Sequence, residues 1–377
     1  MKILLITHQF AIPFSGVGTY ARSLAYGLRE EGMESLILCP SNQCTNDEEF
    51  QFVRTKNVRA AGSHARWLFA SAVFASSMSR AGSCDIIHIL DAREALFLRK
   101  TDIPVVGTIH DYYFTRPLSY WKNRLFFPDW IRRTAYAFLV RILEPRALRA
   151  CDHLIANSWA TKREVGTAYG IPDHRISPVY IGLDPMKTHV TEFSGTKERA
   201  ILFVGGNPYR KGLPRLLRAV EAINRETAVE LWIAGTPLTP ALRRMALSLN
   251  IEDRISVYPH LNASDLANLY SRASCLALPG LTEAFGLVFL EAFAHGCPVI
   301  GPIHGGTSEL IEDGKNGYLV ESDADEDLTR KLIRLLDDAE LRKRFAMEGR
   351  KTLESYTVKR MVRETVSIYE MILSGNR

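Results

Sequence analysis

The sequence predicts an α/β protein built from two doubly wound, Rossmann-like domains. Short apolar strands alternate with helical stretches along the whole length of 377 residues. This alternation is typical of parallel sheets that helices cover on both faces. Two such series are present, and a polar segment without periodicity, Pro185 to Lys197, separates them. We therefore expect one domain over residues 1–184 and a second over residues 185–355.

The first series begins at the first residues of the chain. Lys2 to Thr7 is an apolar run of strand length, Gly18 to Glu31 has helical periodicity, and Ser35 to Cys39 is again strand-like. Further strands are expected at Ile86 to Ile89, Val105 to Ile109, His153 to Ala156 and Ile176 to Tyr180.

The second series begins with a strand from Ala200 to Val204 and a helix from Gly212 to Asn224. Later strands are expected at Val229 to Ala234, Ile255 to Tyr258, Cys275 to Leu278, Val299 to Ile300 and Tyr318 to Val320. Helices are expected at 324–337, 339–353 and 357–373.

Composition is that of a soluble protein with a substantial core. We expect no secretory signal, because only the short run Ile3 to Ile6 follows Lys2 before polar residues resume. Uncharged stretches such as Trp67 to Ser79 are too short and too rich in serine to span a bilayer. The six cysteines show neither a CxxC pair nor zinc-ligand spacing, so we expect reduced thiols in a cytoplasmic protein.

The excess positive charge lies in the first half of the chain. Residues 1–184 carry the whole net charge of +5, and the remainder is neutral. Residues 115–149 hold eight basic side chains against two acidic ones, interleaved with aromatic residues. The alternatives for this segment are a helix with buried aromatics and solvated charges, a surface for anionic membrane, or a nucleic-acid surface. No recognised nucleic-acid motif accompanies it, so we expect no nucleic-acid partner.

Two glutamates mark the most informative stretch of the chain. Glu283 follows a Pro-Gly break, and Glu291 lies in the apolar run Phe285 to Ala294, which predicts a buried helix. Eight helical residues rise about 12 Å, roughly the span from the sugar to the ribose of a nucleotide sugar. A carboxylate in so apolar a helix needs hydrogen-bond donors, and ligand hydroxyls supply them. The alternative is that Glu283 caps the helix and Glu291 pairs with a structural arginine.

Three glycine-bearing loops follow predicted strands, at the edge where open parallel sheets bind ligands. The first, Gly16-Val17-Gly18-Thr19-Tyr20-Ala21, matches GxGxxA, but it lies too far from its strand for a dinucleotide fingerprint. The second, Gly205-Gly206 to Arg210-Lys211-Gly212, puts two cations at a helix start, where an anion would relieve their repulsion with the helix dipole. The third is the glutamate segment itself, whose helix-start amides at Phe285, Gly286, Leu287 and Val288 form an anion site. Gly305-Gly306 opens another helix nearby.

Taken together, these pieces resemble retaining glycosyltransferases of the GT-B fold, in glycosyltransferase family 4. The resemblance covers nearly the whole chain and rests on the ordered set of motifs rather than on any one of them. These are the first glycine loop, Ile109-His110-Asp111, Ala156-Asn157-Ser158, Gly182-Leu183-Asp184, Arg210-Lys211-Gly212, Glu283 to Glu291, and Gly305-Gly306 to Gly317. It implies two Rossmann-like domains facing across a cleft, with residues 356–377 packing back on the first domain.

The resemblance also implies roles for individual residues. Arg210 and Lys211 neutralise the donor diphosphate together with the amides of residues 285–288, Glu291 accepts hydrogen bonds from the ribose, and Glu283 contacts the sugar or the adjoining phosphate. Gly16 and Gly18, with Gly205 and Gly206, are expected to line the donor site. His110 is expected beside the reacting sugar. Many relatives carry arginine at the position of Gly206, so the charge at the phosphate differs here.

The implied reaction transfers a sugar from a UDP- or GDP-linked donor to a hydroxyl of a glycan, glycolipid or lipid-linked acceptor, with retention of configuration. We expect no cofactor and no required metal, because cations and helix-end amides can stabilise the leaving group. Asp323-Ala324-Asp325 matches the metal-binding DxD pattern, but its place at a helix start is explained by capping.

Two alternatives to this function remain at this stage. One is a GT-B relative with other chemistry, such as a sugar-nucleotide epimerase or a phosphorylase. The other is a non-catalytic module that binds nucleotide sugars. The leading hypothesis places the enzyme in cell-envelope polysaccharide or glycoconjugate biosynthesis, in the cytoplasm and at the inner face of the membrane.

Overall fold

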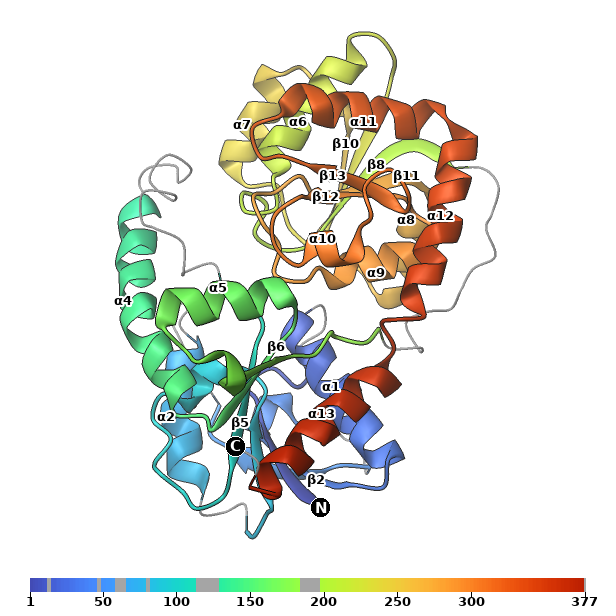
Figure 1. The fold of residues 1–377 in the computed structure, drawn as a ribbon. Helices are drawn as coiled ribbons and strands as arrows, with labels where there is room; N and C mark the ends of the chain where they lie inside the picture. Colours follow the sequence, from blue (N-terminus) through green and yellow to red (C-terminus); the bar gives the residue numbers. More distant parts are fainter. Residues whose placement is uncertain are drawn as a thin grey trace. The chain divides into compact units, whose positions relative to one another are not determined.

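The computed structural model describes residues 1–11, 15–45, 49–57, 66–78, 82–112, 129–183 and 197–375, with the backbone alone for 129–137. The chain divides into two compact units (Figure 1). The first unit consists of Met1–Gly182 together with Val358–Arg377, and the second of Leu183–Thr357. The predicted linker and domain boundary near residue 184 lie outside the described residues, which stop at 183 and resume at 197.

The described residues of the first unit form a seven-stranded parallel sheet in the order β3-β2-β1-β4-β5-β6-β7. Most of its strands are short apolar runs buried on both faces, which is why the sequence predicts them. They are β1 (Lys2–Ile6), β2 (Glu34–Pro40), β3 (Gln51–Thr55), β4 (Ile86–Ile89), β5 (Val105–Ile109), β6 (His153–Ala156) and β7 (Ile176–Pro178).

Helices with side-chain caps connect these strands. Ser15 caps α1 (Gly16–Glu30) by accepting from the Gly18 N–H, and Ser158 caps α5 (Trp159–Tyr169), which ends on the left-handed Gly170. The other helical segments of the unit are η1 (Ser41–Gln43), α2 (Arg66–Ser77), η4 (Ala92–Ala95), α4 (Asp129–Arg149), η6 (Asp173–Arg175) and α13 (Val358–Leu373).

The C-terminal helix α13 belongs to the first unit, as expected from the resemblance (Figure 1). It packs on α1 so closely that a Cβ at Gly27 would lie 2.4 Å from Val362 Cγ2. Its Tyr369 hydroxyl is 2.5 Å from Nδ1 of the buried His88 on β4. Burial, with His110 nearby, lowers the pKa of His88 to about 3, so this imidazole is neutral and its hydrogen bonds fix α13 to the sheet.

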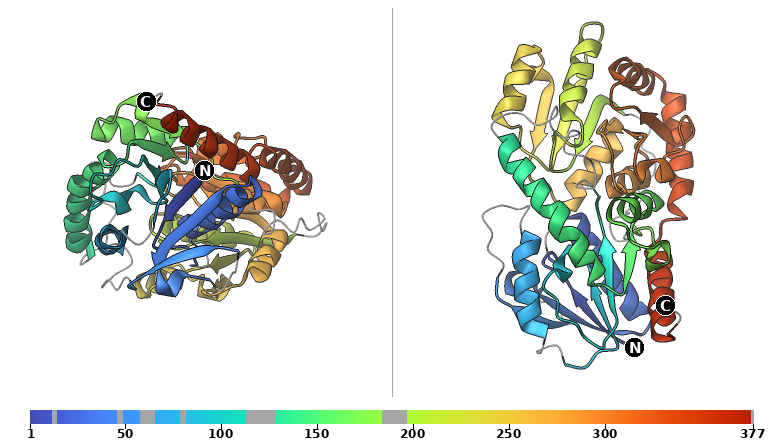
Figure 2. Two further views of the ribbon diagram at one scale, coloured as in Figure 1. Left: turned by 90° about the horizontal axis from the view of Figure 1, so that it is seen from below. Right: turned by 60° about the vertical axis from the view of Figure 1, so that its left-hand side comes forward.

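The second unit forms a six-stranded parallel sheet in the order β10-β9-β8-β11-β12-β13. Figure 2 draws its strands in colours from yellow-green to orange. Its strands are β8 (Glu198–Val204), β9 (Glu230–Ala234), β10 (Ile255–Tyr258), β11 (Ala273–Ala277), β12 (Val299–Pro302) and β13 (Gly317–Val320). Its helical segments are α6 (Leu213–Asn224), α7 (Pro240–Ser248), η8 (Glu252–Arg254), α8 (Ala263–Arg272), α9 (Leu287–Ala294), α10 (Thr307–Leu310), α11 (Asp325–Asp337) and α12 (Ala339–Leu353).

Both units therefore have the doubly wound architecture predicted from the sequence. In each sheet the strand order reverses direction once, between β1 and β4 in the first unit and between β8 and β11 in the second. Loops that leave neighbouring strands at such a point run in opposite directions and open a crevice at the carboxyl ends of the strands, where ligands of doubly wound sheets bind.

Two expectations about local structure need correction. Gly16 and Gly18 do not lie in an open loop but in the first turn of α1, since Ser15 is the cap. Asp323 and Asp325 do not cap α11: Ala324 is at the N-cap and no side chain bonds there. Asp325 instead pairs with Arg215 at 2.7 Å and with Arg218 at 2.9 Å, both on α6.

The six cysteines are free thiols. Among the described residues, no helix has both the length and the apolar composition that a bilayer span requires.

Candidate functional site

The loop after β8 carries Arg210 and Lys211 at the reversal point of the second sheet. Gly205 has a φ of +115°, and a Cβ there would lie 2.8 Å from Lys211 Nζ. The lysine side chain thus lies across the glycine, and its ammonium donates to the Val204 carbonyl at 3.3 Å. Glycine at 205 leaves the room that this cation needs at the strand end.

The same loop is packed against the chain that leaves β11. Gly212, at the N-cap of α6, has a φ of +86°, and a Cβ there would lie 2.3 Å from the Pro279 carbonyl oxygen. A Cβ at Gly280 would lie 2.5 Å from the Arg210 carbonyl oxygen. Two glycines facing one another therefore allow the backbones after β8 and β11 to touch across the crevice.

Glu283 lies in the turn before α9 and is held on three sides. Its carboxylate pairs with Arg210 at 3.0 Å, with side chains that are 17% and 14% exposed. Its carbonyl accepts from the Gly306 N–H at 2.9 Å, and its backbone forms a parallel bridge with Gly305. The glutamate segment and the second glycine-rich helix start, predicted separately from the sequence, thus meet at the backbone of Glu283.

Lys211 is a second cation beside Glu283 and also interacts electrostatically with Glu291. Burial lowers the pKa of its ammonium, Glu283 and Glu291 oppose that effect, and Arg210 adds to it. Two cations and two carboxylates therefore share the crevice between β8 and β11. An anionic ligand that engages Arg210 and Lys211 would improve the balance of charge, since a buried ammonium is costly without a partner.

Helix α9 presents its amino terminus to the same crevice. Gly286 is the N-cap with a φ of +101°, and a Cβ there would lie 2.5 Å from the Phe289 ring and 3.4 Å from Glu283 Cγ. Residues 286–288 are half-buried, whereas Phe285 and Phe289 are buried. N–H groups in the first turn of a helix have no intrahelical acceptor, so this end suits an anion.

Glu291 lies one helical turn and a half beyond that end, on the half-buried face of α9. The Tyr270 hydroxyl donates to its Oε2 at 3.1 Å. Burial, with the carboxylate of Glu291 beside it, raises the pKa of Tyr270 well above its ordinary value, which keeps this hydroxyl a donor. An ionised carboxylate accepts further hydrogen bonds.

The structure thus gathers Gly205, Arg210, Lys211 and Glu283 at one strand reversal, beside the start of α9 that carries Glu291. Gly206 is exposed, and its Cβ position is open on all sides. Among the described residues, no three His, Cys, Asp or Glu side chains are arranged to hold a metal ion.

Gly16, Gly18 and His110 belong to the first unit. The Gly18 N–H donates to Ser15 Oγ at 3.2 Å, so this amide is engaged within α1. Contact of Gly16 or Gly18 with the sugar-donor substrate stays a prediction.

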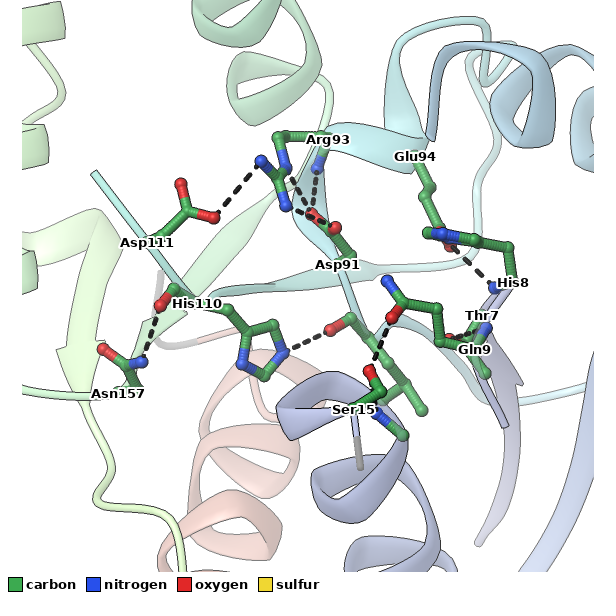
Figure 3. Close-up of polar contacts among 12 residues, drawn as sticks. Thr7, His8, Gln9, Ser15, Asp91, Arg93, Glu94, His110, Asp111 and Asn157 are labelled. Carbon is green, nitrogen blue, oxygen red and sulfur yellow. Dashed lines mark hydrogen bonds and ion pairs between the residues drawn. The ribbon is translucent and has the colours of Figure 1, made fainter. Parts of the chain in front are cut away.

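His110 directly follows β5 and is held by its neighbours (Figure 3). Its Nε2 is 2.7 Å from the Leu90 carbonyl, and its ring meets the Tyr20 ring edge-on at a centroid distance of 5.0 Å. Asn157, after β6, donates to the His110 carbonyl at 2.9 Å. Burial lowers the pKa of His110 although Asp91 opposes it, so the imidazole is neutral and donates to Leu90.

Two charged residues that the sequence did not single out, Asp91 and Arg93, lie near His110 (Figure 3). Arg93 in η4 makes a two-pronged pair with Asp91 at 2.9 and 2.8 Å and reaches Asp111 at 3.3 Å. Burial alone would raise the pKa of Asp91, but Arg93 outweighs it and holds that pKa at about 2. The available signal for Asp91 was positional, because it stands two residues after the buried strand β4.

Helix α4 joins this charged group through Glu144. The Tyr169 hydroxyl donates to the buried Glu144 carboxylate. Burial raises the pKa of Glu144 to about 7, and Arg93 opposes the shift. The folded state therefore holds a proton on this carboxyl that the unfolded chain releases at lower pH.

A pH-dependent stability follows from Glu144. Because its pKa is raised on folding, its contribution is fully present below the unfolded pKa and is lost as pH rises through about 7. Between pH 5.5 and 8 the wild type should lose about 2 kcal/mol of unfolding free energy relative to Glu144→Gln, which cannot ionise. Urea denaturation at both pH values measures this, with the exposed Glu340→Gln as control. Equal pH dependence of wild type and Glu144→Gln would contradict the assignment.

Two family models match this sequence. A family model described as Glycosyl transferases group 1 matches residues 187–352, and one described as Glycosyltransferase Family 4 matches residues 14–187. The two matches together span most of the chain.

Individual relatives agree with these matches. An uncharacterised glycosyltransferase of Methanocaldococcus jannaschii is 25% identical over 398 aligned positions, which cover 99% of each chain. Sucrose-phosphate synthase from Thermosynechococcus elongatus has a similar structure, with a TM-score of 0.78 at 18% identity and 99% coverage of both chains. HepE from Anabaena in complex with UDP and glucose has a TM-score of 0.72 at 18% identity, covering 98% of this chain and 99% of that one.

Proposed function

Because the chain belongs to glycosyltransferase family 4 and is a glycosyltransferase, we propose that it transfers a sugar from a nucleotide-diphosphate sugar, UDP- or GDP-linked. The acceptor is a hydroxyl of a glycan, glycolipid or lipid-linked molecule. Transfer proceeds with retention of configuration and without a metal. One observation carries the proposal: Arg210, Lys211 and Glu283 meet at the β8/β11 reversal, beside the amino terminus of α9.

The charges of this cluster suit the parts of such a donor. In the proposed complex the diphosphate lies between the two cations and the first-turn amides of α9, where negative charge develops as the sugar leaves. Glu283, at the amino end, takes the sugar or the adjoining phosphate, and Glu291, farther along the helix, takes the ribose hydroxyls. The UDP-bound neighbour HepE supports a nucleotide ligand for this fold.

At C1 of the sugar the reaction forms one bond and breaks one, and a proton moves between two oxygens. The acceptor oxygen bonds to C1 of the sugar on the face from which the diphosphate departs with the electron pair of the C1–O bond. The proton of the acceptor hydroxyl passes to the departing phosphate oxygen. Neither glutamate is assigned as a nucleophile, and His110 is proposed beside the sugar.

The proposed contact between Glu291 and the ribose hydroxyls provides a test of the donor site. Glu291→Gln should weaken binding of a ribonucleotide donor about 10-fold, because an amide accepts fewer hydrogen bonds from the two hydroxyls than a carboxylate does. A 2′,3′-dideoxy analogue of the same donor should bind both proteins equally. Isothermal titration with UDP-glucose, GDP-mannose and their dideoxy analogues measures this. An equal loss for both donor types would remove Glu291 from the ribose and contradict the proposed pose.

The same titrations, extended to turnover, separate the alternative functions. An epimerase would convert the donor without releasing a nucleoside diphosphate, and a phosphorylase would need orthophosphate. A binding module would bind the donor without turnover. Release of the nucleoside diphosphate with a sugar transferred to a hydroxyl supports only the transferase.

The biological setting is proposed with the activity. We place the enzyme in cell-envelope polysaccharide or glycoconjugate biosynthesis, in the cytoplasm at the inner face of the membrane. Contact with anionic membrane through residues 115–149 stays a prediction, because residues 113–128 lie outside the described part of the chain. Within the described end of α4, Phe138 and Ile142 are exposed beside the exposed Arg141.

A further inference from the structure

The crevice at the strand reversal of the first sheet holds a histidine–glutamate pair that the donor site does not use. His8 stands two residues after β1, and Glu94 lies in η4, which follows β4. These strands are the neighbours between which the strand order reverses. In the second unit the equivalent crevice carries the proposed donor site, so a second ligand is expected at this one.

The pair fixes the orientation of the imidazole (Figure 3). His8 Nδ1 is in hydrogen-bond contact with Glu94 Oε1, and the His8 backbone N–H donates to the same oxygen at 3.3 Å. Glu94 is only 2% exposed, so its carboxylate is a fixed partner. A carboxylate at Nδ1 keeps the proton on that nitrogen and leaves Nε2 with its lone pair.

The second ring nitrogen remains available to a ligand. Among the described residues, Nε2 of His8 has no hydrogen-bond partner. The His8 residue is 7% exposed. Its Nε2 is not fully enclosed by protein atoms, so solvent reaches it. An accessible acceptor with a carboxylate behind it has the geometry of a histidine that engages a hydroxyl proton.

The charge around His8 selects against a phosphate and in favour of hydroxyls. In the described part of the chain, the charged groups that act on His8 are Glu94, Asp91 and Arg93, and the guanidinium of Arg93 already pairs with Asp91 and Asp111. What remains toward the ligand is an acceptor beside carboxylates, which repel a diphosphate. Sugar and polyol hydroxyls donate to such groups.

We propose that His8, oriented by Glu94, binds the acceptor hydroxyl that is glycosylated, by accepting its hydrogen bond at Nε2. This rests on the proposed transferase function and adds a residue to it. His8 holds the nucleophilic oxygen by this hydrogen bond, and the proton leaves with the diphosphate as described above. Glu94 acts through His8 and is a positioning residue.

Donor hydrolysis tests the proposal without knowledge of the natural acceptor, because water then takes the place of the acceptor hydroxyl. His8→Ala should lower kcat for hydrolysis of the donor that wild type turns over about 100-fold, and Glu94→Gln about 10-fold. KM for the donor should stay within about 2-fold, since donor contacts remain. The control is His153→Ala. His153 is the first residue of β6, three strands from β1 in the same sheet, and its Nε2 is 2.9 Å from Ser177 Oγ.

The pH profile supplies a readout that a structural role would not move. Burial lowers the pKa of His8, but Glu94 outweighs burial and raises it above 6.5. Protonated His8 has no lone pair at Nε2, so wild-type turnover should fall as pH drops through that pKa. Glu94→Gln should move this acid limb to lower pH, and His8→Gln should abolish it.

The outcomes separate this inference from the function on which it rests. Unchanged donor affinity with the predicted loss of kcat and the shifted acid limb supports it. Two outcomes overturn the assignment of His8 while the transferase function stands. In one, His8→Ala turns over the donor as fast as His153→Ala; in the other, His8→Ala loses donor affinity by as large a factor as it loses kcat. A wild type that neither binds nor turns over any nucleotide sugar overturns both.

Discussion

Lys211→Ala should lower turnover of the nucleotide-sugar donor about 10³-fold, the largest effect expected of a single side chain in this molecule. The ammonium lies at the β8/β11 reversal, bonded to the Val204 carbonyl and close to Glu283. In the proposed complex it neutralises charge that develops on the diphosphate only as the sugar leaves. Its loss should therefore appear mainly in kcat.

The measurement is release of nucleoside diphosphate by the purified full chain under single-turnover conditions. Lys315→Ala removes the same charge from an exposed lysine paired with Glu312 and serves as the control. Wild-type rates in Lys211→Ala would remove the lysine from the leaving group and contradict its assignment.

Gly212→Ala should destabilise the second unit by about 3 kcal/mol. Two effects add. An alanine at a φ of +86° is strained, and its Cβ would lie 2.3 Å from the Pro279 carbonyl oxygen, so the backbones after β8 and β11 would have to separate. Arg210 and Lys211 immediately precede this glycine, and donor affinity should fall with stability.

Gly314→Ala isolates the backbone strain from the steric clash. Gly314 has a φ of +77° with nothing within 4 Å of its Cβ position, so this variant should cost only about 1 kcal/mol. Chemical denaturation of both variants gives the comparison. Equal losses would mean that the close approach of the two backbones contributes nothing to stability.

The fold was predictable from the sequence wherever strands are buried on both faces. The run Ala200–Val204 is apolar without interruption and forms most of β8, and Ile86–Ile89, in which His88 is the one polar residue, is strand β4. Strand β3, Gln51–Thr55, was not predicted, because an edge strand that is partly exposed mixes polar and apolar residues. The first residue of a helix was harder to predict from the sequence. Helix α1 begins at Gly16 and not at the predicted Gly18, because Ser15 is its N-cap.

The candidate site was predictable in part. Arg210, Lys211 and Glu283 stand in loops directly after apolar strands, so their place at the sheet edge could be inferred from sequence. Their pairing could not, because the contact between Arg210 and Glu283 depends on β8 and β11 being neighbours in the sheet.

The contact between His8 and Glu94 in the first unit could not be predicted from the sequence either. His8 and Glu94 are 86 residues apart, and only the order of β1 and β4 brings them together. Neither residue belongs to a motif, so the pair is visible only in the structure. A rule that singles out polar residues just after buried strands would have selected His8, Asp91 and Asp111.

Equilibrium binding of nucleoside diphosphates to the full chain tests the central claim most directly, because the claim places a diphosphate at the β8/β11 reversal. Calorimetry with UDP and GDP should show binding of at least one of them to wild type, and much weaker binding of uridine or guanosine. That affinity should fall at least about 10-fold in the double variant Arg210→Ala/Lys211→Ala and remain in His8→Ala. Undiminished binding of the diphosphate by the double variant would contradict the account.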